Sequence, residues 1–157
     1  MSRKPFRVGR SRTGLGLFAL KPIKKGAFIA EYKGRRVDNE EADRMETRGS
    51  RYMYELNSRW TVDGSGRHNI ARYANHSCRP NAESDVVRGE RGRGRKGGMV
   101  ILRAIKNIKP GDEITYHYGR NYFDAFIKEV GCKCMACRKK ATVIRSRRPR
   151  RRTRRRS

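Results

Sequence analysis

The sequence has no long apolar run, because its longest strictly apolar stretch is MVIL at residues 99–102. A helix that crosses a membrane needs ~20 such residues, so no transmembrane helix is expected. The N-terminal residues, MSRKPFRVGR, also lack the apolar segment of a secretory signal peptide. We therefore expect an intracellular protein. Disulfides are rare in that setting, so the four cysteines need another explanation.

Acidic residues are scarce. The 157 residues include 41 Lys and Arg against 15 Asp and Glu, which gives a net charge of +26. The last 20 residues, from Arg138 onward, contain 12 basic residues and no acidic one, whereas residues 1–137 carry 29 basic and 15 acidic residues. Like charges at the density of the C-terminal segment repel one another and cannot pack. Residues 141–157 are therefore predicted to be a disordered basic tail.

Such an excess of positive charge indicates a polyanionic partner. We expect nucleic acid, bound through the Arg-rich tail and through residues 88–98, an Arg- and Gly-rich loop that suits contact with a phosphate backbone. Binding to an anionic membrane surface is an alternative that rests on charge alone. Because the tail has no apolar face to insert, we expect no membrane partner.

Short strand-like segments dominate the rest of the chain. Alternating aromatic and aliphatic residues predict strands at 28–32, 52–56, 60–63, 99–104 and 114–118. Residues 36–50 predict a helix with Asp38 as N-cap and Gly49 as its stop, and residues 121–130 predict a short amphipathic helix. The fold class expected is mainly β, with several small sheets and two short helices.

The cysteines are grouped in a way that suits a metal. Cys132, Cys134 and Cys137 form C-x-C-x-x-C, and Cys78 lies far away in the chain. Four thiolates are the ligand number and type that structural zinc prefers. The alternative is a set of buried free thiols, but the lysines and arginines around the cluster make burial difficult to arrange and favour thiolates. We expect a structural zinc site.

Four segments, taken in order, resemble the SET-domain protein-lysine methyltransferases. They are GLGLFAL at 14–20, RYANHSCRPN at 72–81, IKPGDEITYHYG at 108–119, and the C-x-C-x-x-C at 132–137, which resembles the family's post-SET segment. A single motif of this kind is weak, whereas four in the family's order are specific. The resemblance implies a SET domain at 1–131, a post-SET-like zinc-binding segment at 132–140 and the basic tail at 141–157. It also implies a knot-like fold in which segments 72–81 and 112–119 pack together.

By resemblance, the cofactor is S-adenosylmethionine, and it meets the substrate lysine in a narrow channel. The residues expected to hold the cofactor are Gly14, Leu15, Gly16, Arg72, Asn75, His76 and Tyr118. His76 is then not a general base, and Cys78 is the fourth zinc ligand.

The resemblance gives Tyr118 the catalytic role of orienting the lysine amine. Tyr116 is at the position that limits the number of methyl groups, and a tyrosine there predicts mainly monomethylation. Tyr52 and Tyr54 are expected to line the lysine channel, because aromatic walls suit an alkyl stem and a partial cation. Ordinary strand packing explains Tyr52 and Tyr54 equally well.

The substrates implied are basic chromatin- or nucleoid-associated proteins such as histones. A basic enzyme repels a basic substrate, so we expect the tail to tether the enzyme to nucleic acid near its targets. The place expected is the nucleus and its chromatin, or the bacterial cytoplasm and nucleoid. The alternative function is a non-enzymatic nucleic-acid-binding protein that keeps the SET fold as a scaffold.

Overall fold

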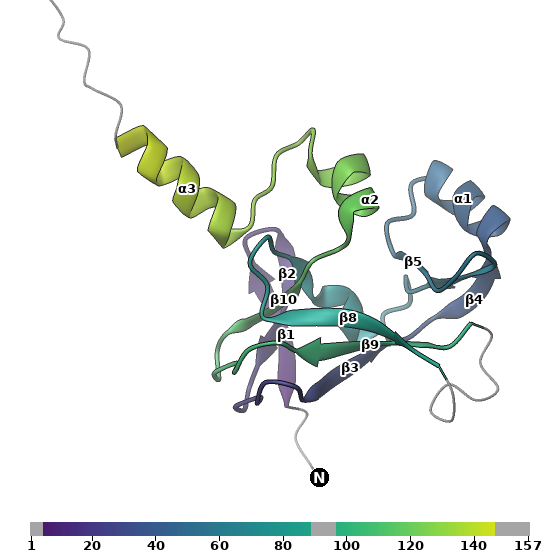
Figure 1. The fold of residues 1–157 in the computed structure, drawn as a ribbon, viewed down its shortest axis with the longest axis horizontal. Helices are drawn as coiled ribbons and strands as arrows, with labels where there is room; N and C mark the ends of the chain where they lie inside the picture. Colours follow the sequence, from purple (N-terminus) through teal and green to yellow (C-terminus); the bar gives the residue numbers. More distant parts are fainter. Residues whose placement is uncertain (1–4, 89–96, 147–157) are drawn as a thin grey trace, which may run out of the picture.

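The computed structural model describes residues 5–88 and 97–146, and it confirms the mainly β fold with several small sheets (Figure 1). The first sheet has the strand order β1-β2-β10-β7. Its strands are β1 (Phe6–Ser11), β2 (Gly14–Ala19), β10 (Glu113–Tyr116) and β7 (Asn75–His76). β1 and β2 form a hairpin in which Ser11 is paired with Gly14, and Gly14 has a φ of 116° that a residue with a side chain rarely adopts.

The parallel pairing of β7 with β10 is the feature of this sheet that matters for function. Thr115 is opposite Asn75, and Tyr116 is opposite His76. Segments 72–81 and 112–119 are therefore neighbours, as the resemblance implied. On its other edge β10 pairs with β2, where Leu17 and Ile114 are opposite each other and both fully buried.

The second sheet has the order β3-β9-β8, with β3 at Phe28–Tyr32, β9 at Met99–Ala104 and β8 at Ala82–Val87. β9 is the central strand, and its Val100 and Leu102 are fully buried. This explains the continuous apolar run MVIL, because a strand covered on both faces has no solvent-facing position for a polar residue. The strands predicted at 28–32 and 99–104 are confirmed.

The third sheet has the order β4-β6-β5, with β4 at Arg35–Asp38, β6 at Trp60–Asp63 and β5 at Met53–Glu55. Helix α1 (Asn39–Thr47) connects β4 to β5, and the Asp38 side chain accepts the Glu41 N–H at 2.7 Å. The predicted N-cap is thus confirmed. The residues before it belong to a strand rather than the helix, because they pair with β6.

A short 3₁₀ helix, η1 (Ile70–Tyr73), precedes β7, and the chain after β10 is helical. The strand predicted at 114–118 ends at Tyr116. The helix predicted at 121–130 is a single turn, α2 (Arg120–Tyr122), continued by a π-helical turn, η3 (Phe123–Ile127). Such turns are rare and are often found at functional sites.

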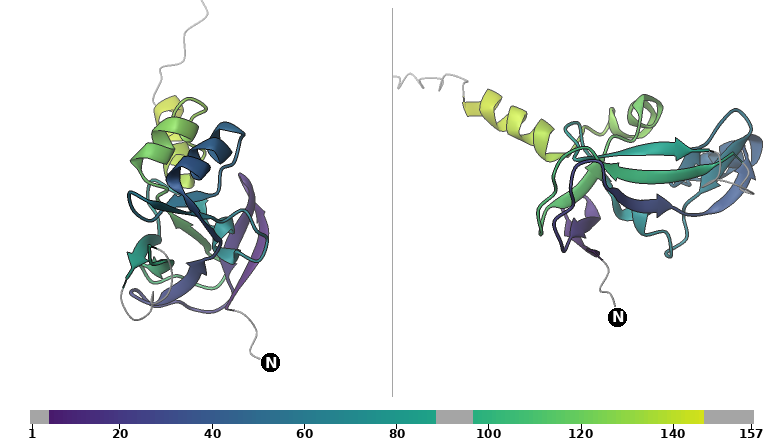
Figure 2. Two further views of the ribbon diagram at one scale, coloured as in Figure 1. Left: turned by 90° about the vertical axis from the view of Figure 1, so that its right-hand side faces the viewer. Right: turned by 60° about the horizontal axis from the view of Figure 1, so that its bottom comes forward.

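One expectation about the C-terminal region, disorder from residue 141 onward, was wrong for residues 141–146. A third helix, α3 (Met135–Ser146), follows the cysteines and extends away from the sheets (Figure 2), so residues 141–146 are helical rather than disordered. The cysteine turn starts this helix, since the Arg138 N–H donates to the Cys134 carbonyl at 3.1 Å. The rest of the predicted tail and residues 89–96 of the predicted loop lie outside the described residues. Among the helices described, none has the length and apolar character needed to cross a membrane.

Candidate active site

The position of Tyr118 is set by contacts with the segment around β7, which is paired with β10. Its hydroxyl donates to the Ala74 carbonyl at 2.9 Å, and its backbone N–H donates to Nδ1 of His76 at 3.3 Å. Burial raises the pKa of Tyr118 well above the ordinary value for tyrosine. The side chain is therefore a neutral phenol at physiological pH, able to donate and accept hydrogen bonds but not to act as a base.

Aromatic rings surround Tyr118. The ring centroids of Tyr116 and Tyr118 are 4.9 Å apart, and those of Tyr118 and Tyr122 are 5.1 Å apart with nearly perpendicular planes. Tyr116 is 7% exposed, and burial raises its pKa well above the ordinary value. These rings form a largely apolar neck in which a charged amine is poorly solvated.

The predicted channel residues Tyr52 and Tyr54 belong to the same site. The Tyr54 hydroxyl donates to Oγ of Ser84 at 2.9 Å, and the carbonyl of Tyr52 accepts from the Tyr32 hydroxyl at 3.0 Å. Sequence reasoning missed Tyr32 and Tyr122 as members of this cluster. Tyr122 was read only as part of an amphipathic helix, and nothing in that pattern separates a core-facing ring from a site-facing one.

Two cavities, each of about 670 Å³, meet at this aromatic cluster. Four residues line both cavities and form the wall between them: Met53, Tyr54, Tyr118 and Tyr122. We name the first the cationic cavity, because Arg51, Arg67 and Arg72 line it without any carboxylate among the described residues. We name the second the acidic cavity, because Asp43, Glu46 and Glu55 line it against the single arginine Arg120.

Arg72 is the best-defined cation of the cationic cavity. Its guanidinium carbon lies 4.0 Å from the centre of the Tyr52 ring, and one of its terminal nitrogens donates to the Ser65 carbonyl. Its Nε is buried and has no acceptor among the described residues. The positive charge of Arg51, Arg67 and Arg72 suits this side of the site to an anionic group such as a carboxylate.

The acidic cavity takes its charge largely from helix α1, which supplies Asp43 and Glu46. Partial burial, and after it the proximity of Asp43, raise the pKa of Glu46. Two carboxylates that repel each other are stabilised by an incoming cation. The sequence could have indicated this acidic patch, because residues 38–63 contain seven of the 15 acidic residues. The net charge of the whole chain does not show this clustering.

Most of the predicted cofactor residues gather on the cationic side. Leu15, Arg72, Asn75 and Tyr118 line the cationic cavity. His76 instead lines an adjoining hollow of about 410 Å³, which shares Asn75 and Tyr118 with that cavity. Gly14 and Gly16 contribute to neither lining, although they belong to the same strand as Leu15.

Glu113, which sequence reasoning missed, explains why residue 16 of the Gly-x-Gly strand is a glycine. Nδ2 of Asn75 donates to the Leu15 carbonyl at 2.9 Å and to Oε1 of Glu113 at 2.7 Å, and the Ser11 hydroxyl donates to the same oxygen at 2.7 Å. A Cβ at Gly16 would lie 2.6 Å from that oxygen. In this structure, therefore, the Asn75 side chain joins the Gly-x-Gly strand to β10, and glycine at position 16 leaves room for the carboxylate.

His76 has the properties of a neutral structural residue. Burial, and to a smaller extent His117, lower its pKa to about 4. Because Nδ1 accepts the Tyr118 N–H, the proton of the neutral ring is on Nε2, which lies 3.5 Å from Sγ of Cys78. This agrees with the expectation that His76 is not a general base.

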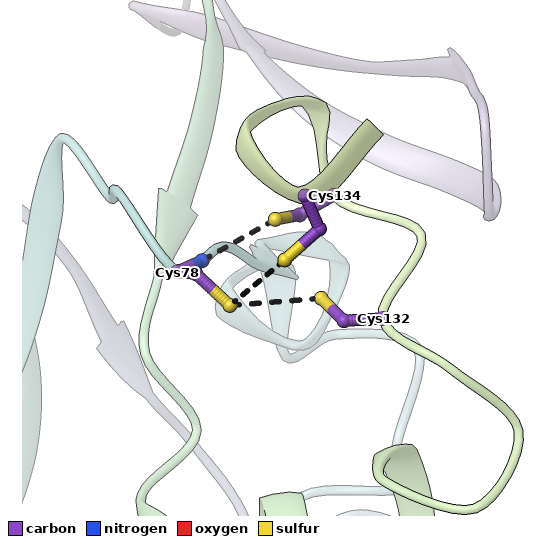
Figure 3. Close-up of side chains that lie close together, drawn as sticks. Cys78, Cys132 and Cys134 are labelled. Carbon is purple, nitrogen blue, oxygen red and sulfur yellow. Dashed lines mark hydrogen bonds between the residues drawn. The ribbon is translucent and has the colours of Figure 1, made fainter. Parts of the chain in front are cut away.

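The four cysteines converge as expected (Figure 3), and their sulfur atoms all lie within 4.8 Å of one another. Sγ of Cys78 is 3.7 Å from that of Cys132 and 3.5 Å from that of Cys137, and the Cys78 N–H donates to Sγ of Cys134 at 3.5 Å. Tetrahedral zinc with Zn–S bonds of ~2.3 Å places its sulfur ligands about 3.8 Å apart. The donor set and its spacing therefore fit zinc, which would anchor the start of α3 to the segment after β7.

Comparison with known proteins agrees with these observations. Residues 14–119 match the family model described as SET domain. Histone-lysine N-methyltransferase 2D of Homo sapiens is 36% identical over 141 residues, which cover 84% of this chain and 2% of that protein. Histone-lysine N-methyltransferase mes-4 of Caenorhabditis elegans is 38% identical over 120 residues, which cover 69% of this chain and 13% of that protein.

Among solved structures, ctPRC2 in an autoinhibited conformation bound to S-adenosylmethionine is similar, with a TM-score of 0.65 and 26% identity. The match covers 82% of this chain and 17% of that one. The chain thus spans only a small fraction of the length of the relatives that it matches.

The cysteine geometry predicts that the purified protein holds about one zinc ion per chain. Cys78→Ser removes the ligand that comes from the body of the domain, so we expect the zinc content to fall well below that of the wild type and α3 to become protease-sensitive. Elemental analysis of the dialysed protein checks the first result, and limited proteolysis checks the second. Ser58→Ala, at an exposed position away from the cysteines, is the control. Equal zinc content in wild type and Cys78→Ser would contradict the assignment.

Proposed function

The chain belongs to the SET-domain family, and on that basis we propose that it is a protein-lysine methyltransferase that uses S-adenosylmethionine. The observation that carries this proposal is the wall formed by Tyr54, Tyr118 and Tyr122 between two cavities of opposite charge. Such a wall allows a cofactor held by its carboxylate on one side to meet a cationic side chain that enters from the other side.

The cationic cavity is the proposed cofactor site. S-adenosylmethionine supplies a methyl group on a sulfonium together with a carboxylate. Arg72, which lines this cavity together with Arg51 and Arg67, is suited to that carboxylate. Leu15 and Asn75 line the same cavity, and Lys133 lines the adjoining hollow beside Asn75.

The acidic cavity is the proposed entry for the substrate. Asp43, Glu46 and Glu55 attract a lysine and the other cations of a basic segment, although the protein as a whole repels them. The aromatic neck then receives the alkyl stem. In water a lysine amine has a pKa near 10.4, and desolvation in the neck lowers this pKa, so the proton leaves to water through the acidic side.

Tyr118 orients the neutral amine. Its own proton is used in the bond to the Ala74 carbonyl, so its oxygen is free to accept an N–H of the lysine. This leaves the nitrogen lone pair directed at the methyl group. The new N–C bond forms as the S–C bond breaks, and alignment of the two accounts for much of the rate.

We propose that the substrates are basic chromatin- or nucleoid-associated proteins, and that the protein acts at chromatin or at the nucleoid. The relatives are named histone-lysine N-methyltransferases, which supports this class of substrate. The Arg-rich C-terminal segment is proposed to hold the enzyme on nucleic acid. The scaffold alternative has the charge in its favour but does not explain a tyrosine wall between two cavities.

Replacing Tyr118 tests the proposal most simply. Tyr118→Phe removes the oxygen that orients the amine, and we expect methylation of lysines in a nuclear or nucleoid extract to fall by about 100-fold or more. The measurement uses labelled S-adenosylmethionine and mass spectrometry of modified lysines. Cofactor binding by calorimetry and the melting temperature serve as controls: the ring that lines the cofactor cavity is kept, so the cofactor should still bind, and loss of the bond to the Ala74 carbonyl should lower the melting temperature only slightly. Unchanged labelling would contradict the role of Tyr118, and absence of cofactor binding in both proteins would favour the scaffold.

Tyr116 is proposed to restrict the product mainly to monomethyl-lysine. Its ring packs 4.9 Å from that of Tyr118 and is nearly buried, so its hydroxyl occupies space that a methylated amine needs. Tyr116→Phe should shift the products toward di- and trimethyl-lysine at similar total turnover. Mass spectrometry of one peptide over time measures the distribution. A wild type that yields mainly trimethyl-lysine, with no change in the variant, would contradict this assignment.

A further inference from the structure

Helix α3 forms a groove against the loop that follows β7. The groove has a volume of about 530 Å³. It is lined by Ser77, Arg79, Met135, Ala136, Lys139, Lys140 and Val143. The α3 residues at positions 136, 139, 140 and 143 have the spacing of a single helix face, so one face of α3 is turned toward Arg79. This groove is separate from the two cavities that meet at Tyr118.

The charge of the groove has one sign. Arg79, Lys139 and Lys140 are all exposed, and no carboxylate lines the groove among the residues described. The sequence has no acidic residue after Glu129, so nothing C-terminal to that position neutralises the groove. Three cations that line one groove repel one another, and a ligand with several negative charges relieves that repulsion.

The groove is also held in shape. The Cys78 N–H donates to Sγ of Cys134, and the Arg79 N–H donates to the Ser77 hydroxyl at 3.1 Å. The first of these contacts joins the loop to the start of α3, and the second lies within the loop, so the backbone positions that carry the three cations are held relative to one another. Between them, Met135 and Val143 are 51% and 48% exposed. This places apolar surface between the charges.

We propose that this groove binds the sugar-phosphate backbone of double-stranded nucleic acid. The three cations contact successive phosphates, and Met135 and Val143 pack against the sugars between them. A long polyanion fits best, because the sequence that follows the groove residues of α3 is rich in arginine and contains no acidic residue. The proposal does not rest on methyl transfer. It assigns nucleic-acid contact to a folded surface in addition to the Arg-rich segment.

The test compares two triple variants of the full-length protein without cofactor. One is Arg79→Gln with Lys139→Gln and Lys140→Gln. The control is Lys21→Gln with Lys24→Gln and Lys25→Gln, which removes the same charge from exposed positions beyond the far end of β2. Fluorescence anisotropy measures the affinity for a short labelled DNA duplex over a KCl series. Since each phosphate contact contributes about 0.9 to the slope of log affinity against log salt, the groove variant should lower that slope by about 2 to 3.

The control variant should lower the slope by less than about 1. A charge-retaining variant, Arg79→Lys with Lys139→Arg and Lys140→Arg, should restore the wild-type slope, which separates lost contact from misfolding. Equal slopes for the groove and control variants would overturn the proposal. A glutamate-rich peptide of matched charge is titrated in parallel. If the groove substitutions weaken binding of the peptide but not of the duplex, the groove is a protein-docking surface and the proposal is wrong.

Discussion

The parallel pairing of β7 with β10 is the constraint on which the site depends. It places Asn75 opposite Thr115 and His76 opposite Tyr116, and Tyr118 is then fixed through the Ala74 carbonyl and the His76 ring. The pairing joins segments about forty residues apart, so loop closure opposes it and side-chain bonds must support it. The Asn81 side chain supports the pairing with two bonds to β10, because it donates to the Glu113 carbonyl at 2.8 Å and accepts from the Thr115 N–H at 2.9 Å.

The two cavities on either side of the tyrosine wall carry opposite charges. Arginines line one cavity and carboxylates line the other, and under the proposed function the first would hold the cofactor carboxylate and the second would admit the substrate lysine. The wall itself is uncharged, because burial raises the pKa of Tyr54, Tyr118 and Tyr122 and keeps them in their neutral forms. In a chain of net charge +26, the acidic cavity is a local exception, and it is the part of the surface that suits the basic substrate proposed above.

Much of this could be predicted from local sequence. Asp38 begins a helix, MVIL forms a buried strand, and Cys132, Cys134 and Cys137 form one cluster, because capping, periodicity and close ligand spacing depend on neighbouring residues. The distant Cys78 was expected to join them from the number of ligands that zinc prefers and from the family resemblance. The rest depends on residues that only the fold brings together. Glu113 receives Ser11 and Asn75 from two other strands, and no local pattern shows that. Helix α3 was missed because a basic composition predicts disorder, whereas its first turn is organised by the cysteine cluster.

The most direct test of the two-sided site measures cofactor and substrate separately in two variants. Asp43→Asn with Glu46→Gln alters only the acidic cavity, and Arg72→Gln alters only the cationic one. Calorimetry gives the dissociation constant of S-adenosylmethionine, and steady-state kinetics gives the KM of a basic peptide. The account predicts that the first variant raises only the peptide KM and the second weakens only the cofactor. Weaker cofactor binding in the first variant, with an unchanged peptide KM, would contradict it.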